Sequence, residues 1–251
     1  MWATRCTHEA KMHDANCWLT LTYNDENLPS NGTLLPSDLQ NFLKRYRRKI
    51  APDKIRFYAC GEYGENLGRP HYHICIFGHD FADKIFHSET GRGDKLYTSK
   101  TLDKIWGKGH ALIGDLTFET AAYTARYITK KITGENSQEH YGIDKETGET
   151  KHPEFTRMSN RPGLGRTWYE KFKSDVFPYD EVIINGAKTK PPRYYTELYK
   201  VDNPAGHEQV AADRVAAMKK HESDNTPSRL NQRETVKKAQ HKQLKRHLEE
   251  K

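Results

Sequence analysis

The segment Arg69-Pro70-His71-Tyr72-His73-Ile74-Cys75-Ile76-Phe77 constrains the fold of this chain more than any other. It places two histidines two residues apart at the start of an apolar run, which predicts a β-strand. Because side chains alternate faces along a strand, His71 and His73 point to the same side of the sheet. Two imidazoles on one face can hold one metal ion between them. Taken alone, the segment is more often an ordinary strand that opens on two polar residues, so the metal hypothesis needs further support.

The composition favours a polar, basic protein with one main core. A chain of 251 residues can bury one substantial core, with room for a small second unit. Its 41 Lys and Arg residues outnumber 34 Asp and Glu residues, giving a formal net charge of +7 and a pI near 9.0. This balance favours nucleic acid or anionic surfaces as partners, although only weakly by itself. The hydrophobic fraction of 35% and the mean hydropathy of −0.97 indicate a polar tail or a large polar binding surface.

Neither a membrane segment nor a cysteine framework is predicted. No apolar run approaches the roughly 20 residues that a membrane helix needs, so we expect no membrane contact. The four cysteines form no CxxC pair and no zinc-ligand spacing, and we expect them to be reduced, as in a cytosolic protein.

Hydrophobic periodicity predicts an α+β fold. Strands are expected at 17–23, 55–62, 71–77 and 110–116. A helix with an apolar stripe should follow the capping-box pattern that begins at Ser37, and a second should run over 118–133 after a Thr117 cap. The stretches 5–14 and 101–106 are possible short helices. This order suits an antiparallel central sheet of about five strands with packed helices, close to the ferredoxin-like (RRM-like) arrangement.

Glu62 is the predicted third metal ligand. It ends the strand that pairs with the histidine strand, and a hairpin loop over 63–70 would place it directly opposite His71. Opposite residues share a face, with Cβ atoms about 5 Å apart. A register slip of one residue would move Glu62 to the other face. The alternative is an ordinary carboxylate at the edge of a loop.

The motif Tyr123-x-x-x-Tyr127-x-x-Lys130 supplies the second chemical feature. Ala121, Ala125, Ile128 and Ile132 form the expected packing stripe of this helix. At about 100° per residue, the two tyrosines and Lys130 fall on nearly the opposite side, so we expect that the core does not need them. Phenols one turn apart could reach the same reaction centre.

A phenol with a pKa of about 10 is a weak nucleophile at neutral pH. A metal ion that withdraws charge from a phosphate, with Lys130 nearby, would make the phosphorus easier to attack, so that a weakly nucleophilic phenol could suffice. The combination predicts metal-assisted tyrosine chemistry on DNA, with Tyr123, Tyr127 and Lys130 as catalytic residues.

The basic residues are the predicted DNA contacts. Lys44, Arg45, Arg47 and Arg48 lie on the helix that follows Ser37 and are equally well explained as a solvated helix face. The remaining predicted DNA contacts are Arg69, Arg126 and Lys131.

At these motifs the chain resembles the replication initiators of the HUH endonuclease superfamily, and most closely those of microviruses, especially the gokushovirus branch. Trp18–Tyr23 is similar to the first motif of the family, Arg69–His73 to its metal motif and Tyr123–Lys130 to its paired-tyrosine helix. Cys60–Gly64 matches the segment that supplies the acidic residue. The resemblance runs in family order over about Trp2–Phe172.

The resemblance implies an HUH endonuclease fold and rolling-circle replication. Origin nicking would leave a 5′-phosphotyrosine and a free 3′-hydroxyl, and the second tyrosine would later cleave and circularise the product. It also implies single-stranded origin DNA, a host polymerase and the cytoplasm of a bacterial host. Two histidines and one carboxylate suit Mg²⁺ or Mn²⁺, although imidazole also suits zinc, cobalt and nickel. No Walker motif is visible, so we expect a separate helicase. Two rival interpretations remain: a related relaxase or transposase, and a non-catalytic single-stranded DNA-binding module.

The predicted domain organisation has three parts. Residues 1–135 should form the endonuclease domain, 136–202 an extension that packs on it or continues it, and 203–251 a charged tail that is helical or partly disordered. Family members usually carry a segment with cysteine and arginine before the position of Trp2, so we expect an internal start or a truncation here.

Overall fold

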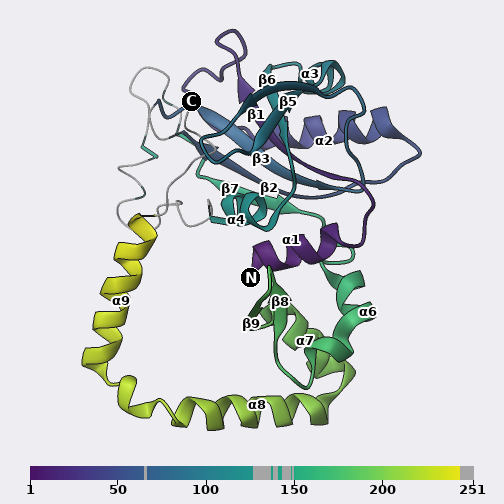
Figure 1. Cartoon of the computed structure of the whole chain (residues 1–251). Helices are drawn as coiled ribbons and strands as arrows, with labels where there is room; N and C mark the ends of the chain where they lie inside the picture. Colours follow the sequence, from purple (N-terminus) through teal and green to yellow (C-terminus); the bar gives the residue numbers. More distant parts are fainter. Residues whose placement is uncertain (65–66, 127–136, 138–140, 143–147, 149, 244–251) are drawn as a thin grey trace. The chain divides into compact units, whose positions relative to one another are not determined.

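The computed structural model describes residues 1–64, 67–126, 137, 141–142, 148 and 150–243. The chain divides into two compact units, with the boundary between Trp168 and Tyr169. Figure 1 shows the elements of both units along the chain.

The larger unit is built around one antiparallel sheet of seven strands, in the order β4-β5-β6-β1-β3-β2-β7. Its elements are α1 (Trp2–Ala10), β1 (Asn16–Tyr23), α2 (Pro36–Ile50), β2 (Arg56–Tyr63), β3 (Pro70–Phe77), β4 (Ile85–Glu89), β5 (Lys95–Thr98), α3 (Lys100–Trp106), β6 (Gly109–Gly114), α4 (Phe118–Arg126) and β7 (Phe155–Met158).

The predicted α+β class is confirmed, and the centre of the sheet has the ferredoxin-like strand order. Strands β6, β1, β3 and β2 lie side by side, and α2 connects β1 to β2 with β3 inserted between them. The predicted number of about five strands is too low. The hairpin β4–β5 carries no apolar alternation that would mark it, because β4 is mostly exposed, and β7 joins the sheet from beyond residue 135.

The two faces of the sheet bury two separate clusters, because side chains alternate along each strand. On one face, α2 and α3 cover Leu19, Leu21 and Tyr72. On the other, α1 and α4 cover Trp18, Tyr58 and Cys75 (Figure 1). All eight residues of β3 are buried, since β3 pairs with β1 on one side and β2 on the other.

Helix α2 begins two residues earlier than the capping-box prediction requires. Leu35 is the N-cap and makes no side-chain capping bond, so the prediction of a cap at Ser37 is wrong. Pro36 lies in the first turn, where its fixed φ favours the helix. Residues of the first turn have no hydrogen-bond acceptor within the helix for their N–H groups, so a proline there removes no hydrogen bond. The predicted Thr117 cap is confirmed, since Thr117 Oγ1 accepts a bond from the Thr120 amide at 3.2 Å.

A buried carboxylate fastens α1 to the rest of the larger unit. Glu9 is 1% exposed, and its side chain accepts bonds from Arg56 Nε at 2.5 Å and the Gly165 amide at 2.6 Å. These bonds and His13 lower the pKa of Glu9, although burial alone would raise it. The carboxylate therefore ties the first helix to β2 and to the loop before α6 (Arg166–Val176).

The smaller unit consists mainly of helices. Its elements beyond α6 are β8 (Val182–Ile184), β9 (Ala187–Thr189), α7 (Arg193–Asp202), α8 (Pro204–Lys219), a short 3₁₀ helix (Glu222–Asp224) and α9 (Pro227–Lys242). Asp180 accepts bonds from both Arg214 and Lys190, which links α8 to the β8–β9 hairpin. Val210 is the one buried residue of α8. Among the described residues, no helix is long and apolar enough to cross a membrane.

Candidate active site

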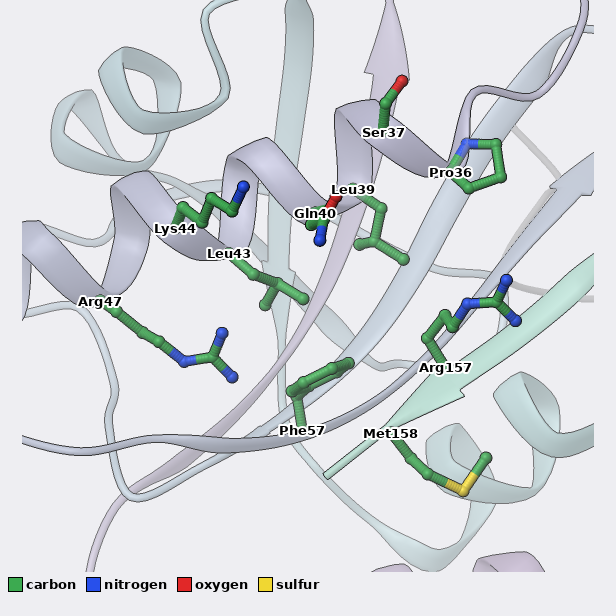
Figure 2. A pocket seen from close by; sticks show the side chains of 10 residues that line it. All are labelled: Pro36, Ser37, Leu39, Gln40, Leu43, Lys44, Arg47, Phe57, Arg157 and Met158. Atoms are coloured by element: carbon green, nitrogen blue, oxygen red, sulfur yellow. The ribbon is translucent and has the colours of Figure 1, made fainter. Parts of the chain in front are cut away.

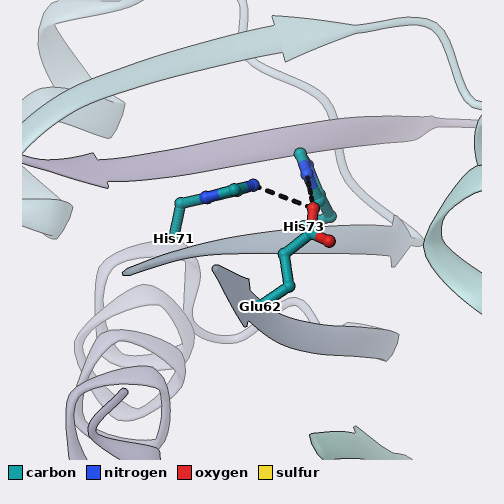
Figure 3. Close-up of side chains that lie close together, drawn as sticks. All are labelled: Glu62, His71 and His73. Carbon is teal, nitrogen blue, oxygen red and sulfur yellow. Dashed lines mark hydrogen bonds and ion pairs between the residues drawn. The ribbon is translucent and has the colours of Figure 1, made fainter. Parts of the chain in front are cut away.

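Two neighbouring strands bring Glu62, His71 and His73 together. The register of β2 and β3 places Glu62 directly opposite His71, as predicted, and His73 follows two residues later on the same face. The Nε2 atoms of His71 and His73 lie 2.8 and 2.9 Å from the same Glu62 oxygen, Oε1 (Figure 3). All three candidate ligand atoms lie within 4.8 Å of one another. Glu62 is fully buried, and the histidines are 8% and 1% exposed.

The buried Glu62 carboxylate carries a negative charge that a proton or a cation within the cluster must balance. Burial would raise the pKa of Glu62, but hydrogen bonds from His71 and His73 lower it to about 2, so the carboxylate is ionised. His71 Nδ1 lies 3.1 Å from the Arg69 carbonyl oxygen, which can only accept, so this nitrogen carries a proton. His71 Nε2 then faces a carboxylate, and it needs either a second proton or a cation between the two groups. A buried carboxylate with two imidazoles is a donor set that fits a divalent metal ion.

Thr20 positions the second histidine. Its hydroxyl oxygen lies 3.0 Å from His73 Nδ1, directly across the β1–β3 pair. The outer nitrogen of each histidine thus has a fixed partner, Thr20 for His73 and the Arg69 carbonyl for His71. Such outer partners orient the rings of metal-binding histidines. The sequence does not single out Thr20, although polar residues at alternate positions of β1 are a signal that could identify it.

Tyr123 lies beside the metal candidates, but it is not on a free helix face. The prediction that the core does not need Tyr123 is wrong, because the residue is 3% exposed and belongs to the cluster under α4. Its ring packs edge-on against His73, with centroids 5.1 Å apart. The helical wheel assumed one packing partner, whereas α4 contacts α1 on one side and strands β2 and β3 on another.

Trp18 joins the metal candidates to α4. Its ring stacks on His73, with centroids 5.0 Å apart and planes inclined by 12°, and it meets Tyr123 edge-on at 5.9 Å. Its indole N–H donates to Thr124 Oγ1 at 2.9 Å. One indole therefore fixes the distance between the histidine strand and the tyrosine helix.

The rest of the predicted tyrosine motif lies outside the described residues. Tyr127, Lys130 and Lys131 fall in this part of the chain, as does the predicted continuation of the helix beyond Arg126. The guanidinium of Arg126 lies 6.0 Å from the centre of the Tyr123 ring.

Two of the predicted DNA contacts, Arg45 and Arg69, form hydrogen bonds with other parts of the chain. Arg45 donates from Nε to the Ile105 carbonyl at 2.7 Å and from Nη2 to the Trp106 carbonyl at 2.9 Å, so it caps the end of α3. Arg69 donates to the Tyr23 carbonyl at 3.1 Å and to Asp25 at 2.6 Å.

The other three predicted DNA contacts on α2 are Lys44, Arg47 and Arg48. Like Arg45, they are exposed on this helix. Because α2 covers the face of the sheet that holds Leu19 and Tyr72, these cations and the histidine cluster lie on opposite faces.

The fold and the cluster define an α+β protein with a candidate metal centre on a central sheet. Residues 16–132 match the model of a family described as replication-associated protein ORF2. The chain is 34% identical over 210 residues to replication-associated protein VP4 of Bdellovibrio phage phiMH2K, a match that covers 80% of this chain and 63% of the relative. No solved structure matches.

Two further relatives carry similar names. Replication-associated protein ORF2 of Spiroplasma virus 4 is 33% identical over 206 residues, covering 77% of this chain and 61% of the relative. Replication-associated protein ORF4 of Chlamydia phage 1 is 28% identical over 206 residues, covering 79% and 49%. The resemblance to microvirus proteins is thereby confirmed, and the chain is related to the replication-associated proteins of these phages. It spans less than two thirds of the length of each of these relatives.

Proposed function

We propose that the chain is a rolling-circle replication initiator that nicks and rejoins single-stranded origin DNA. One observation carries this proposal: Glu62, His71 and His73 share one buried site, and the Tyr123 ring packs against His73. A metal-binding donor set next to a tyrosine suits phosphodiester transfer to a phenol. The names of the phage relatives support a role in replication.

In the proposed reaction, the phenol oxygen of Tyr123 attacks the scissile phosphorus. A new bond forms between phosphorus and the tyrosine oxygen, and the bond from phosphorus to the 3′-oxygen breaks. The phenol proton leaves, and the departing 3′-oxygen takes up a proton to become a hydroxyl. The DNA keeps a free 3′-end, and its 5′-phosphate is linked to the protein. Because one phosphodiester replaces another, a 3′-hydroxyl can reverse the reaction without ATP.

Glu62, His71 and His73 are the residues that would hold Mg²⁺ or Mn²⁺. The ion would supply positive charge to the phosphate oxygens as charge builds up on them. Thr20 and the Arg69 carbonyl hold the two imidazoles in place, while Trp18 keeps α4 at a fixed distance from His73. Tyr127 is the other proposed nucleophile of the motif, and Lys130 is the residue proposed to stabilise the developing charge.

The wider role follows from this chemistry. The free 3′-end would prime a host polymerase, and a separate helicase would open the duplex in the cytoplasm of the bacterial host. The second tyrosine would release and circularise the product.

A covalent-adduct assay tests the proposal. Single-stranded DNA from the cognate genome and Mn²⁺ should give a protein–DNA adduct on denaturing gels. The double change Tyr123→Phe with Tyr127→Phe should abolish the adduct, because only the attacking oxygens are removed. Tyr179→Phe is the matched control, since this phenol is 71% exposed and lies in the smaller unit. An adduct that persists in the double variant would overturn the nucleophile assignment.

His71→Ala separates the metal role from DNA binding. It should abolish Mn²⁺-dependent cleavage while leaving salt-sensitive DNA binding largely intact. Binding with no cleavage in the unchanged protein would favour the non-catalytic DNA-binding module. Cleavage of plasmid-transfer or transposon-end sequences in preference to the phage origin would favour a relaxase or transposase.

A further inference from the structure

A groove lies on the α2 face of the sheet, opposite the face of the histidine cluster. It has a volume of about 550 Å³ and runs between α2 and strands β2 and β7 (Figure 2). Leu39 and Leu43 of α2 line one side, and Phe57 of β2 lies at the base. Strand β7 is the last strand of the sheet, so the groove opens at a sheet edge.

Three cations line this groove. Lys44 and Arg47 come from α2 and Arg157 from β7, and Figure 2 shows the Arg47 guanidinium beside Phe57. The Arg157 guanidinium lies 5.3 Å from the centre of the Phe155 ring. All three residues are exposed, and no acidic residue is among the residues that line the groove. None of the ion pairs in the described part of the chain involves any of them. Within the described part of the chain, the groove therefore concentrates positive charge that no ion pair with a carboxylate neutralises.

The base of the groove is apolar and partly aromatic. The Arg47 guanidinium lies 5.4 Å from the centre of the Phe57 ring, an arrangement in which a planar cation covers an aromatic face. Arg157 Nη1 donates to the neighbouring Thr156 carbonyl at 3.1 Å. This bond uses one of the five N–H groups of the guanidinium. Cations that contact phosphates beside an apolar surface that contacts bases are the two components of single-stranded nucleic acid sites.

The groove is distinct from the candidate active site. Phe57 and Glu62 lie five residues apart on β2, which is about 17 Å along the strand. An odd separation also places their side chains on opposite faces of the sheet. The nucleotides that occupy the groove therefore cannot contact the histidine cluster directly.

We propose that this groove is a second binding site for single-stranded DNA, which holds nucleotides away from the phosphate that is cut. Naming DNA as the ligand rests on the proposed function, but binding in the groove requires neither the metal nor the tyrosines. Such a site would retain the strand between nicking and rejoining, when one end of the DNA is free. Lys44, Arg47 and Arg157 contact phosphates, and the partly exposed Met158 provides apolar surface for a base.

Direct binding to the whole chain tests the groove. A fluorescent oligothymidylate of about 20 nucleotides is titrated in EDTA, so that metal-dependent cleavage cannot occur. Changing Arg47→Gln together with Arg157→Gln should raise the Kd about tenfold or more. It should also reduce the slope of log K against log salt by about 1.4, because two phosphate contacts to a single strand are lost.

The matched control changes Lys49→Gln together with Lys54→Gln. These cations are exposed at the end of α2 and shortly after it, are not among the predicted DNA contacts and do not line the groove, and their replacement lowers the net charge by the same amount. The control should change the Kd less than twofold. Equal loss in both double variants would show general electrostatic attraction and overturn the proposal, and so would no loss in either.

Two further measurements test whether the ligand of the groove is a DNA strand and whether the groove takes part in the cleavage reaction. Competition by poly-glutamate or a free deoxynucleotide as strong as by oligothymidylate would overturn the assignment to a DNA strand. The rate of adduct formation at saturating DNA should be the same in the groove variant as in the unchanged protein. If no adduct forms with the unchanged protein, the proposed nicking activity is wrong. The binding measurement in EDTA still tests the groove proposal in that case.

Discussion

Replacing Thr20 with valine tests whether the histidine cluster is organised to bind a metal ion. The change keeps the shape of the side chain and removes the hydroxyl that lies 3.0 Å from His73 Nδ1. Because His73 is 1% exposed, no bulk water can replace the lost partner easily. Loss of such an outer partner typically weakens metal binding 10- to 100-fold. We therefore expect the Kd for Mn²⁺ to rise at least about tenfold, equivalent to about 1.4 kcal/mol.

Calorimetric titration of the metal-free protein with Mn²⁺ measures this effect. Thr22→Val is the matched control, because Thr22 lies on the same face of β1 opposite His71. Among the described contacts, no hydrogen bond joins the Thr22 hydroxyl to a histidine, so its Kd should stay within about twofold of the unchanged protein. Unchanged Mn²⁺ affinity in Thr20→Val would refute the argument that Thr20 positions His73. Equal weakening in both variants would show only a general disturbance of β1.

Two further predictions concern stability. His8 stacks on Trp168 with ring centroids 3.5 Å apart, and burial, with a contribution from Lys11, lowers its pKa to about 3. Between about pH 6.5 and pH 3 the unfolded chain therefore binds a proton that the folded chain does not, so acid lowers the free energy of unfolding by at most about 1.4 kcal/mol per pH unit. In urea unfolding, His8→Gln should show a weaker dependence of this free energy on pH. An identical pH dependence in the variant and the unchanged protein would contradict the prediction. Arg45→Met should lower the free energy of unfolding by about 1–2 kcal/mol, because two bonds to the end of α3 are lost. The Kd for oligothymidylate should change no more than with Lys49→Gln, and a larger loss of binding would show that Arg45 contacts DNA.

The metal candidates could be predicted because they depend on local rules. Alternation along a strand places His71 and His73 together, and a short hairpin loop leaves few possible registers for Glu62. Both rules use residues that are close in sequence, and the observed register agrees with them. The same locality explains why the central strands were predicted more easily than the exposed strand β4.

The environments of Tyr123 and Arg45 depend on long-range packing instead. A helical wheel separates one buried stripe from one exposed face, but α4 packs on two sides and buries Tyr123 as well as Ala121. A run of cations on α2 gives no sign that Arg45 reaches the end of α3, which is distant in sequence. The groove at Phe57 likewise needs β7, whose contribution of Arg157 follows from pairing between strands far apart in the chain.

The complete burial of β3 has a consequence for the thermodynamics of metal binding. Because β3 is paired along both edges, the backbone amides of His71 and His73 should exchange with solvent only when the whole unit unfolds, and therefore slowly. The binding site is then already formed before the ion arrives, and binding need not be coupled to folding. Metal should raise the melting temperature in proportion to the logarithm of its concentration above the Kd, with no change in helix or strand content.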